Sequence, residues 1–192
     1  MKLLAGVVIG LLVVALAALA VAWSGVIDMS ATAPSTALER VVGTTLADRS
    51  IHRRAPRARN PLEATPEVLR TGLDHYRENC VVCHGAPGVA AGEAAKGLNP
   101  PAPDLSLADA QEPSDGELFE VIGHGIRMSG MPGWLPTHTE REIWAIVAFM
   151  RHLPSLTPEE RRALARGGEA EEEHAAHHGG EAPAAGGDSP RP

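Results

Sequence analysis

The pentapeptide Cys80-Val81-Val82-Cys83-His84 contains both cysteines of the 192-residue chain, followed directly by a histidine. C-x-x-C-H is the attachment signature of c-type haem. Two thiols at this spacing can add to the two vinyl groups of one porphyrin, and the adjacent imidazole can then ligate the iron. The motif therefore predicts one haem c, covalently attached through Cys80 and Cys83, with His84 as an axial ligand.

Two other kinds of site use closely spaced cysteines. A thioredoxin-like redox pair requires a βαβ context, and the sequence contains no alternating strand pattern of any length. A zinc site requires two further ligands at matched spacing, for which His124 or His138 could be proposed without other support. Covalent haem is the interpretation that we favour.

Composition limits the size and class of the folded part. Hydrophobic residues make up 44% of the chain, but aromatic residues make up only 3%, and much of the apolar content lies in the first two dozen positions. We expect one small domain, of a size that benefits from a disulfide, metal or cofactor. A net charge of −7 without a basic stripe makes nucleic acid an unexpected partner.

The N-terminus carries an uninterrupted apolar run over residues 3–23, with Lys2 as the one charged side chain before it. Such a run forms a helix of roughly 30 Å, the thickness of a bilayer core. Charge placement predicts a cytoplasmic N-terminus and an exported remainder. Ala20-Val21-Ala22 also fits a signal-peptide cleavage site, but the run exceeds the usual ~7–15-residue signal core. We therefore expect residues 1–23 to be a single-pass anchor in the inner membrane, with the remaining chain on the periplasmic side.

The segments flanking the expected domain are polar. Residues 24–64 lack a sustained period and are interpreted as a linker. Its arginine cluster is interpreted as solvated, with anionic lipid or an acidic partner as the alternative. Residues 169–192 are expected to be disordered. Weak copper or zinc binding by the tail is the alternative for its histidines, which are His174, His177 and His178.

Helix-start signals organise the middle of the chain. A capping residue followed by Pro66 and Glu67 predicts one helix start, and capping-box patterns predict three more. The fold class is therefore all-α, with a domain over 65–155 and a short helix over 156–168. The expected N-cap residues are Thr65, Ser114, Thr139 and Thr157.

A second axial ligand has several candidates. Met150 lies on the apolar face of the expected last helix, where core packing is the simpler role, and His152 lies near the end of that helix. The loop over residues 125–134 contains two methionines among glycines, which allow close backbone approach, and a proline. The residues alone leave four loop candidates open: His124, Met128, Met131 and His138.

Four features make residues 65–155 resemble a class I c-type cytochrome, of the membrane-anchored monohaem kind similar to the cytochrome c modules of bacterial haem–copper oxidases. Gly72, Tyr76 and Cys80 are four residues apart, and Ile146 and Phe149 fall where the last helix meets that glycine and aromatic. The other two features are a proline-rich segment and a methionine loop, which are residues 99–105 and 130–134.

The resemblance implies a small fold of three to four helices around a covalent haem. It implies Met131, rather than Met128, as the second ligand of an iron held by His84. It suggests that the carbonyl of Pro100 or Pro101 accepts a hydrogen bond from the His84 ring. It also places Trp134 at the haem, either as a donor to a propionate or as a wall of the pocket.

These expectations combine into a function. A six-coordinate haem suits single-electron transfer better than catalysis, so we expect a carrier and not an enzyme. Residues 65–155 contain twelve acidic residues against six Lys or Arg, which favours encounter with a basic docking face. Redox proteins of unknown identity are the expected partners, and an integral subunit of an oxidase or dehydrogenase is the alternative.

Overall fold

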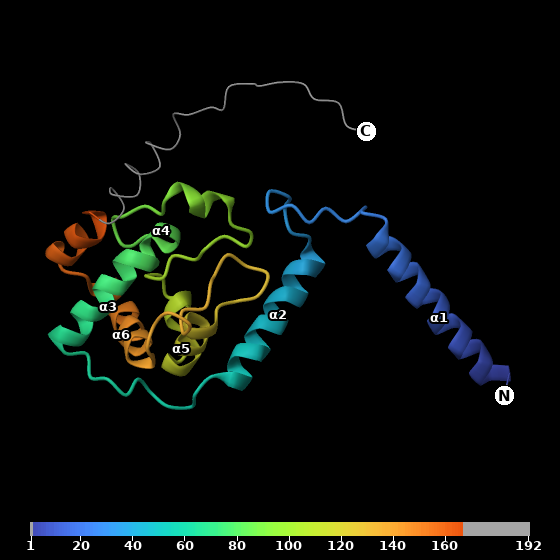
Figure 1. The fold of residues 1–192 in the computed structure, drawn as a ribbon, viewed down its shortest axis with the longest axis horizontal. Helices are drawn as coiled ribbons and strands as arrows, with labels where there is room; N and C mark the ends of the chain where they lie inside the picture. The colour runs from blue at the N-terminus through green and yellow to red at the C-terminus, as the bar shows by residue number, and fades with distance from the viewer. Residues whose placement is uncertain (1, 167–192) are drawn as a thin grey trace, which may run out of the picture. The chain divides into compact units, whose positions relative to one another are not determined.

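The computed structural model describes residues 2–166, and its regular elements in this part of the chain are all helical (Figure 1). The prediction of an all-α fold is confirmed for these residues, in which an isolated bridge between Ala86 and Val89 is the one β-type pairing. The labelled α-helices are α1 (Lys2–Trp23), α2 (Ala37–Arg54), α3 (Pro66–Asn79), α4 (Val81–His84), α5 (Asp115–His124) and α6 (Glu140–His152). Short 3-10 helices cover Glu93–Gly97, Asp109–Gln111 and Leu153–Ser155.

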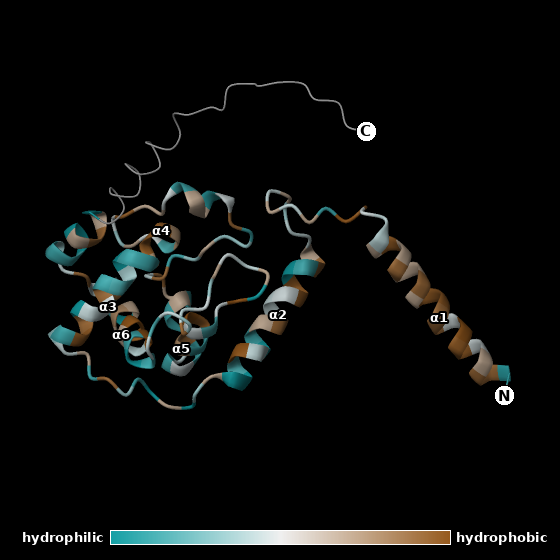
Figure 2. Ribbon diagram, viewed as in Figure 1, coloured by the Kyte–Doolittle hydropathy of each residue, from teal (hydrophilic) through white to brown (hydrophobic). Residues whose placement is uncertain are grey.

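The chain divides into two compact units, residues 1–34 and the remainder. The first unit contains α1, whose ribbon is mostly hydrophobic in colour after Lys2 at its start (Figure 2), and none of its residues is buried. A helix of 22 residues has a length of ~33 Å, enough to cross a hydrocarbon core of ~30 Å. By length and composition α1 can be a membrane span or a signal sequence.

The core of the second unit is the crossing of α3 and α6, which is the most extensive helix contact of the domain. Gly72 of α3 lies against the backbone of Ala145, and a side-chain carbon there would lie 2.6 Å from Cβ of Phe149. Phe149 and Tyr76 are fully buried, with ring centroids 5.5 Å apart. The predicted close approach at Gly72 is confirmed, and it needs glycine because no larger residue fits.

The predicted helix starts are also confirmed. Thr65 accepts a hydrogen bond from the Val68 amide, and α3 begins with Pro66. A complete capping box begins both α5 and α6. In each box the side chain of the glutamate, Glu117 or Glu142, accepts a hydrogen bond from the backbone amide of the N-cap residue. These local bonds satisfy amide groups that a helix leaves unpaired at its first turn.

The structure differs from the sequence interpretation within residues 24–64. This segment, expected to be a linker without regular structure, contains the 18-residue helix α2, which starts with a capping box at Thr36 and Glu39. The signal was present as T-x-x-E before apolar residues. Most of the apolar residues of α2 are exposed and do not face the core, so the segment lacks the core-facing pattern that indicates a packed helix.

Polar contacts dock α2 on α5. Nε of Arg54 lies 2.6 Å from a carboxylate oxygen of the buried Glu120, and Nδ1 of His52 lies 3.0 Å from Glu117. A side-chain carbon at Gly116 would overlap the carbonyl of Pro56, just after α2. Glu120 is buried, so loss of its Arg54 partner would leave a buried charge uncompensated. These contacts therefore hold α2 against the domain.

The last described segment is helical over residues 158–166 and follows a capping box at Thr157 and Glu160. Leu164 of this segment is fully buried. The end of the predicted helix over 156–168, and the predicted disordered tail with its three histidines, lie outside the described residues.

Candidate functional site

The junction between α3 and α4 brings the three motif residues together. The amides of Cys83 and His84 both donate to the carbonyl of Cys80, at 3.1 and 2.9 Å. In one helical turn, residues three and four apart share a face. The turn therefore presents both sulfur atoms and the imidazole on one side, as attachment to a single planar ligand requires.

The chain that follows this turn is closed back onto α3 and α4. The buried hydroxyl of Tyr76 donates to the Gly85 carbonyl at 2.7 Å, and the Gly92 amide donates to the Val82 carbonyl at 2.8 Å. Gly85 has a φ of 61°, and a side-chain carbon there would lie 2.7 Å from the carbonyl oxygen of Val89. Glycine is therefore required at this position, and Tyr76 fixes the exit from the motif.

The His84 ring is oriented by a backbone carbonyl. Its Nδ1 lies 2.8 Å from the oxygen of Pro103. The predicted acceptors, Pro100 and Pro101, are therefore corrected to Pro103. Prolines provide carbonyl acceptors but no amide hydrogens, so a run of them does not reveal which carbonyl faces the ring.

Side-chain bonds hold the Pro103 segment in place. The carboxylate of Asp104 accepts from the amide and hydroxyl of Ser106, at 2.9 and 2.6 Å. These bonds lower the pKa of Asp104 below its ordinary value. Gln111 donates to the carbonyls of Leu105 and Met150, at 2.7 and 3.1 Å, which ties the segment to α6. The bond at Nδ1 leaves Nε2 as the ring nitrogen suited to a metal.

The loop after α5 distinguishes the two methionines. The Ser129 hydroxyl donates to the Ile126 carbonyl at 2.7 Å and accepts from the Met131 amide at 3.1 Å. Met131 is partly buried against the core, whereas Met128 is 80% exposed. Gly125, with a φ of 69°, lies so close to Gly133 that a side-chain carbon would be 2.6 Å from its amide nitrogen. The loop thus turns Met131 inward and Met128 outward.

The other ligand candidates have partners within the protein. Met150 is buried in the core. Nε2 of His152 lies 3.1 Å from Glu160, and Nδ1 of His124 lies 3.2 Å from Glu120. His138 contacts the Thr137 hydroxyl at 2.9 Å. Only the contact of His152 occupies Nε2, since His124 and His138 are bonded through Nδ1 as His84 is. The inward position of Met131 in its loop therefore makes it the strongest candidate.

Trp134 lies at the end of the same loop and packs against the core. Its ring meets that of His138 edge-on, with centroids 5.2 Å apart, and its amide donates to the Ile122 carbonyl at 3.0 Å. These contacts suit a wall of the pocket, and the suggested bond to a propionate remains a prediction.

The alternative chemistries for the cysteine pair are disfavoured. Burial, with a smaller contribution from Cys83, raises the pKa of the Cys80 thiol to about 12, whereas thiol–disulfide exchange uses thiols of lowered pKa. Among residues 2–166, no three His, Cys, Asp or Glu side chains are placed to share a metal ion. The donor set instead fits a covalent haem: two adjacent thiols, an imidazole oriented through Nδ1, and an inward-facing thioether.

An all-α domain that contains a C-x-x-C-H turn, here Cys80 to His84, is typical of the c-type cytochromes. Residues 67–150 match the family model described as cytochrome c oxidase, cbb3-type, subunit III. Residues 67–150 are therefore a c-type cytochrome module of the cbb3-oxidase kind, which confirms the resemblance seen in the sequence. No curated protein was found to match the chain.

Proposed function

We propose that this protein is a membrane-anchored, monohaem electron carrier whose iron has histidine and methionine ligands. The observation that carries the proposal is the C-x-x-C-H turn, with the His84 ring oriented by Pro103 at 2.8 Å, inside a cytochrome c domain. A cytochrome c domain implies haem c and electron transfer rather than catalysis. When bound, the haem iron supplies the one-electron redox couple.

Four residues of the chain have separate roles in binding the haem. Cys80 and Cys83 would form the thioether links, which would prevent loss of the cofactor. His84 would supply Nε2 to the iron, and its bond to Pro103 would fix the ring plane and raise the basicity of the ligand. Met131 would supply a thioether to the iron, and such a ligand would favour Fe(II) and exclude small ligands.

Membrane attachment follows from α1. We propose that α1 is retained as a single-pass anchor with Lys2 on the cytoplasmic side, and that the haem domain faces the periplasm. Tethering confines the domain to the layer next to the membrane, where respiratory partners are found. N-terminal sequencing of the mature protein decides between an anchor and a cleaved signal, because cleavage after Ala22 would remove the helix.

The acidic charge of the domain suggests that its redox partners bind through a basic surface. With twelve acidic residues against six Lys or Arg over 65–155, long-range attraction would speed encounter with a basic surface. The rate of electron transfer to such a partner should fall as salt is added. Stopped-flow measurements at increasing ionic strength test this expectation.

A second candidate function is an integral cytochrome subunit of a larger oxidase or dehydrogenase. The observation that favours it is the description of the matching family, which names an oxidase subunit. Purification from membranes in mild detergent separates the two proposals. A free carrier elutes alone, whereas a subunit elutes with the catalytic polypeptides at constant stoichiometry.

A CO-difference spectrum of the reduced protein tests the carrier against a ligand-binding enzyme. Because Met131 would occupy the sixth position, we expect no spectral shift when CO is added to the native protein. A full shift would show an open iron and would remove the electron-carrier proposal.

A further inference from the structure

One side of α2 exposes an apolar surface that the domain does not use. Four large side chains within its first ten residues, Leu38, Val41, Val42 and Leu46, are between 47% and 73% exposed. They follow helical spacing i, i+3, i+4 and i+8, which places them on one stripe. We call this stripe, with the arginines described below, the outer face of α2.

The opposite side of α2 is already occupied. Ala47, Ser50 and Ile51 are partly buried, and Arg54 pairs with the buried Glu120. The helix is therefore fixed in orientation by its contacts with α5 and cannot turn its apolar stripe inward. An exposed apolar stripe on a docked helix indicates a binding surface.

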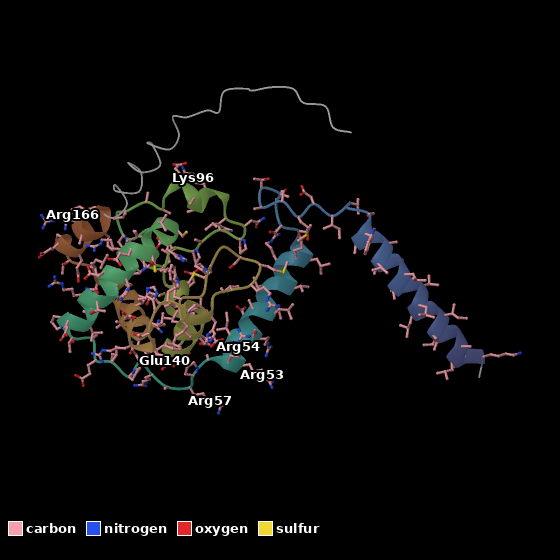
Figure 3. All side chains as sticks on the ribbon, viewed as in Figure 1. Arg53, Arg54, Arg57, Lys96, Glu140 and Arg166 are labelled. Carbon is pink, nitrogen blue, oxygen red and sulfur yellow. The ribbon has the colours of Figure 1, made fainter. Side chains whose placement is uncertain are left out.

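The second half of the outer face is basic. Residues eleven apart on a helix are separated by only ~20° around its axis, so Arg49 lies in line with Leu38, and Arg53 in line with Val42. Both arginines are exposed. Figure 3 places Arg53 at the C-terminal end of α2 and Arg57 just beyond it. The outer face thus changes from apolar to cationic along its length.

We propose that the outer face of α2 lies on the surface of an anionic lipid bilayer. Apolar side chains of an interfacial helix enter the boundary between headgroups and acyl chains, while arginines reach anionic headgroups. Only 13 residues separate the end of α1 at Trp23 from the start of α2 at Ala37, a maximum reach of ~45 Å. If α1 is retained, as proposed above, α2 is therefore held within reach of the bilayer.

Charge makes this contact directional. Residues 24–64 contain six arginines against four acidic residues, whereas residues 65–155 have an acidic excess. An anionic bilayer would attract the outer face of α2 and repel the rest of the domain. Contact through α2 would therefore set which side of the cytochrome faces the membrane and which side remains open to partners.

A protein partner would fit the outer face less well. A standard protein interface uses about 20–30 residues from each side, whereas the outer face is a stripe on one helix. A lipid surface needs no more than one amphipathic helix. The basic end of the outer face is complementary to any negatively charged surface and does not require a partner of a particular shape.

The test uses the full haem-loaded chain in vesicles of phosphatidylcholine, with and without phosphatidylglycerol. A nitroxide is attached at Val42→Cys or, as the matched control, at Thr44→Cys, which is exposed and ~160° away around the helix. Thioether formation at Cys80 and Cys83 leaves the introduced thiol as the one to label. Collisions with oxygen and with a water-soluble nickel chelate report lipid and water contact.

We expect the oxygen-to-nickel ratio at residue 42 to rise several-fold when phosphatidylglycerol is present, with residue 44 unchanged. Arg49→Gln with Arg53→Gln should remove this rise, whereas Lys96→Gln, on an exposed 3-10 helix, should not. Water-like values at residue 42 in both lipid mixtures would overturn the proposal. Shielding from both reagents that appears only in native membranes would overturn it in favour of a protein partner. The absorption spectrum of the same sample reports the haem separately.

Discussion

The two sides of the site are built in different ways. We call residues 66–84, which form α3 and α4, the proximal side, and residues 115–134, which form α5 and the loop after it, the distal side. Proximal groups lie within one turn of helix, and the helix crossing at Gly72 supports that turn. The distal methionine lies in a loop that depends on Ser129, on close glycine contacts and on α5 docked against α2. Helix geometry therefore sets the spacing of the proximal groups, whereas contacts within a folded loop set the position of the distal methionine.

The largest expected effect is on the proximal side. His84→Ala removes the proposed ligand and should abolish or severely impair formation of the haem-loaded protein, because no neighbouring side chain replaces the imidazole. Covalent haem per polypeptide, measured by absorption after denaturing electrophoresis, checks this. Normal covalent haem with an unchanged spectrum would contradict the assignment of His84.

Met131→Ala should have a smaller effect on haem attachment than His84→Ala. The protein should keep its covalent haem, but its reduction potential should fall, and the reduced iron should bind CO, because the distal thioether is missing. Potentiometric titration and a CO-difference spectrum measure both effects.

Met128→Ala is the matched control for this variant, since Met128 is 80% exposed in the same loop. It should leave the potential and the spectrum unchanged. An altered spectrum for Met128→Ala together with an unchanged one for Met131→Ala would reverse the ligand assignment.

Gly72→Ala tests the proximal scaffold without touching the ligands. The added carbon would lie 2.6 Å from Cβ of Phe149, and forcing α3 and α6 apart should cost ~1–3 kcal/mol of unfolding free energy. Gly43→Ala in α2 is the control, because its added carbon meets nothing within 4 Å and should stabilise the helix by up to ~1 kcal/mol. Denaturant unfolding compares the two, and equal effects would contradict the close crossing.

Ser129→Ala tests the distal loop. The hydroxyl makes bonds of 2.7 and 3.1 Å within the loop, so its loss should cost ~1 kcal/mol and should let CO bind slowly while Met131 remains. CO-binding kinetics of the reduced variant measure this. Ser106→Ala, near Pro103 on the other side, should leave CO exclusion intact, and CO binding in that variant instead would contradict the loop's role.

The smallest expected effect is on the stability of the fold at acidic pH, through Glu117. Hydrogen bonds from His52 and Ser114 lower the pKa of Glu117 to about 2, from an ordinary value of 4.5. A lowered pKa in the folded state stabilises the fold above the ordinary pKa, and this contribution is lost as pH falls from ~4.5 towards 2. Thermal melting of the native protein and Glu117→Gln should therefore converge over this range. A constant difference between them at all pH values would contradict the linkage.

The same contrast explains what the sequence could predict. The motif at Cys80–His84, the capped helix starts and the glycine at 72 are local patterns, and they predicted the fold class and the proximal residues. Pro103 could not be identified, because the choice among neighbouring carbonyls depends on how Asp104 and Gln111 fix the segment. Helix α2 was missed because its apolar side faces outward and its docking relies on ion pairs with α5. The sequence likewise does not show which loop methionine faces the core, because the inward position of Met131 and the exposure of Met128 depend on the folded shape of the loop.

The central claim is that Cys80, Cys83 and His84 hold one covalent haem c. Its most direct test is an absorption spectrum of the reduced protein and of its denatured pyridine complex, with acidic acetone extraction of the same sample. We predict one haem per chain, with a pyridine complex typical of haem whose vinyl groups are both saturated, and we expect this haem to stay with the polypeptide on extraction. Haem that moves into the acetone, or a protein purified from a haem-competent host without haem, would contradict it.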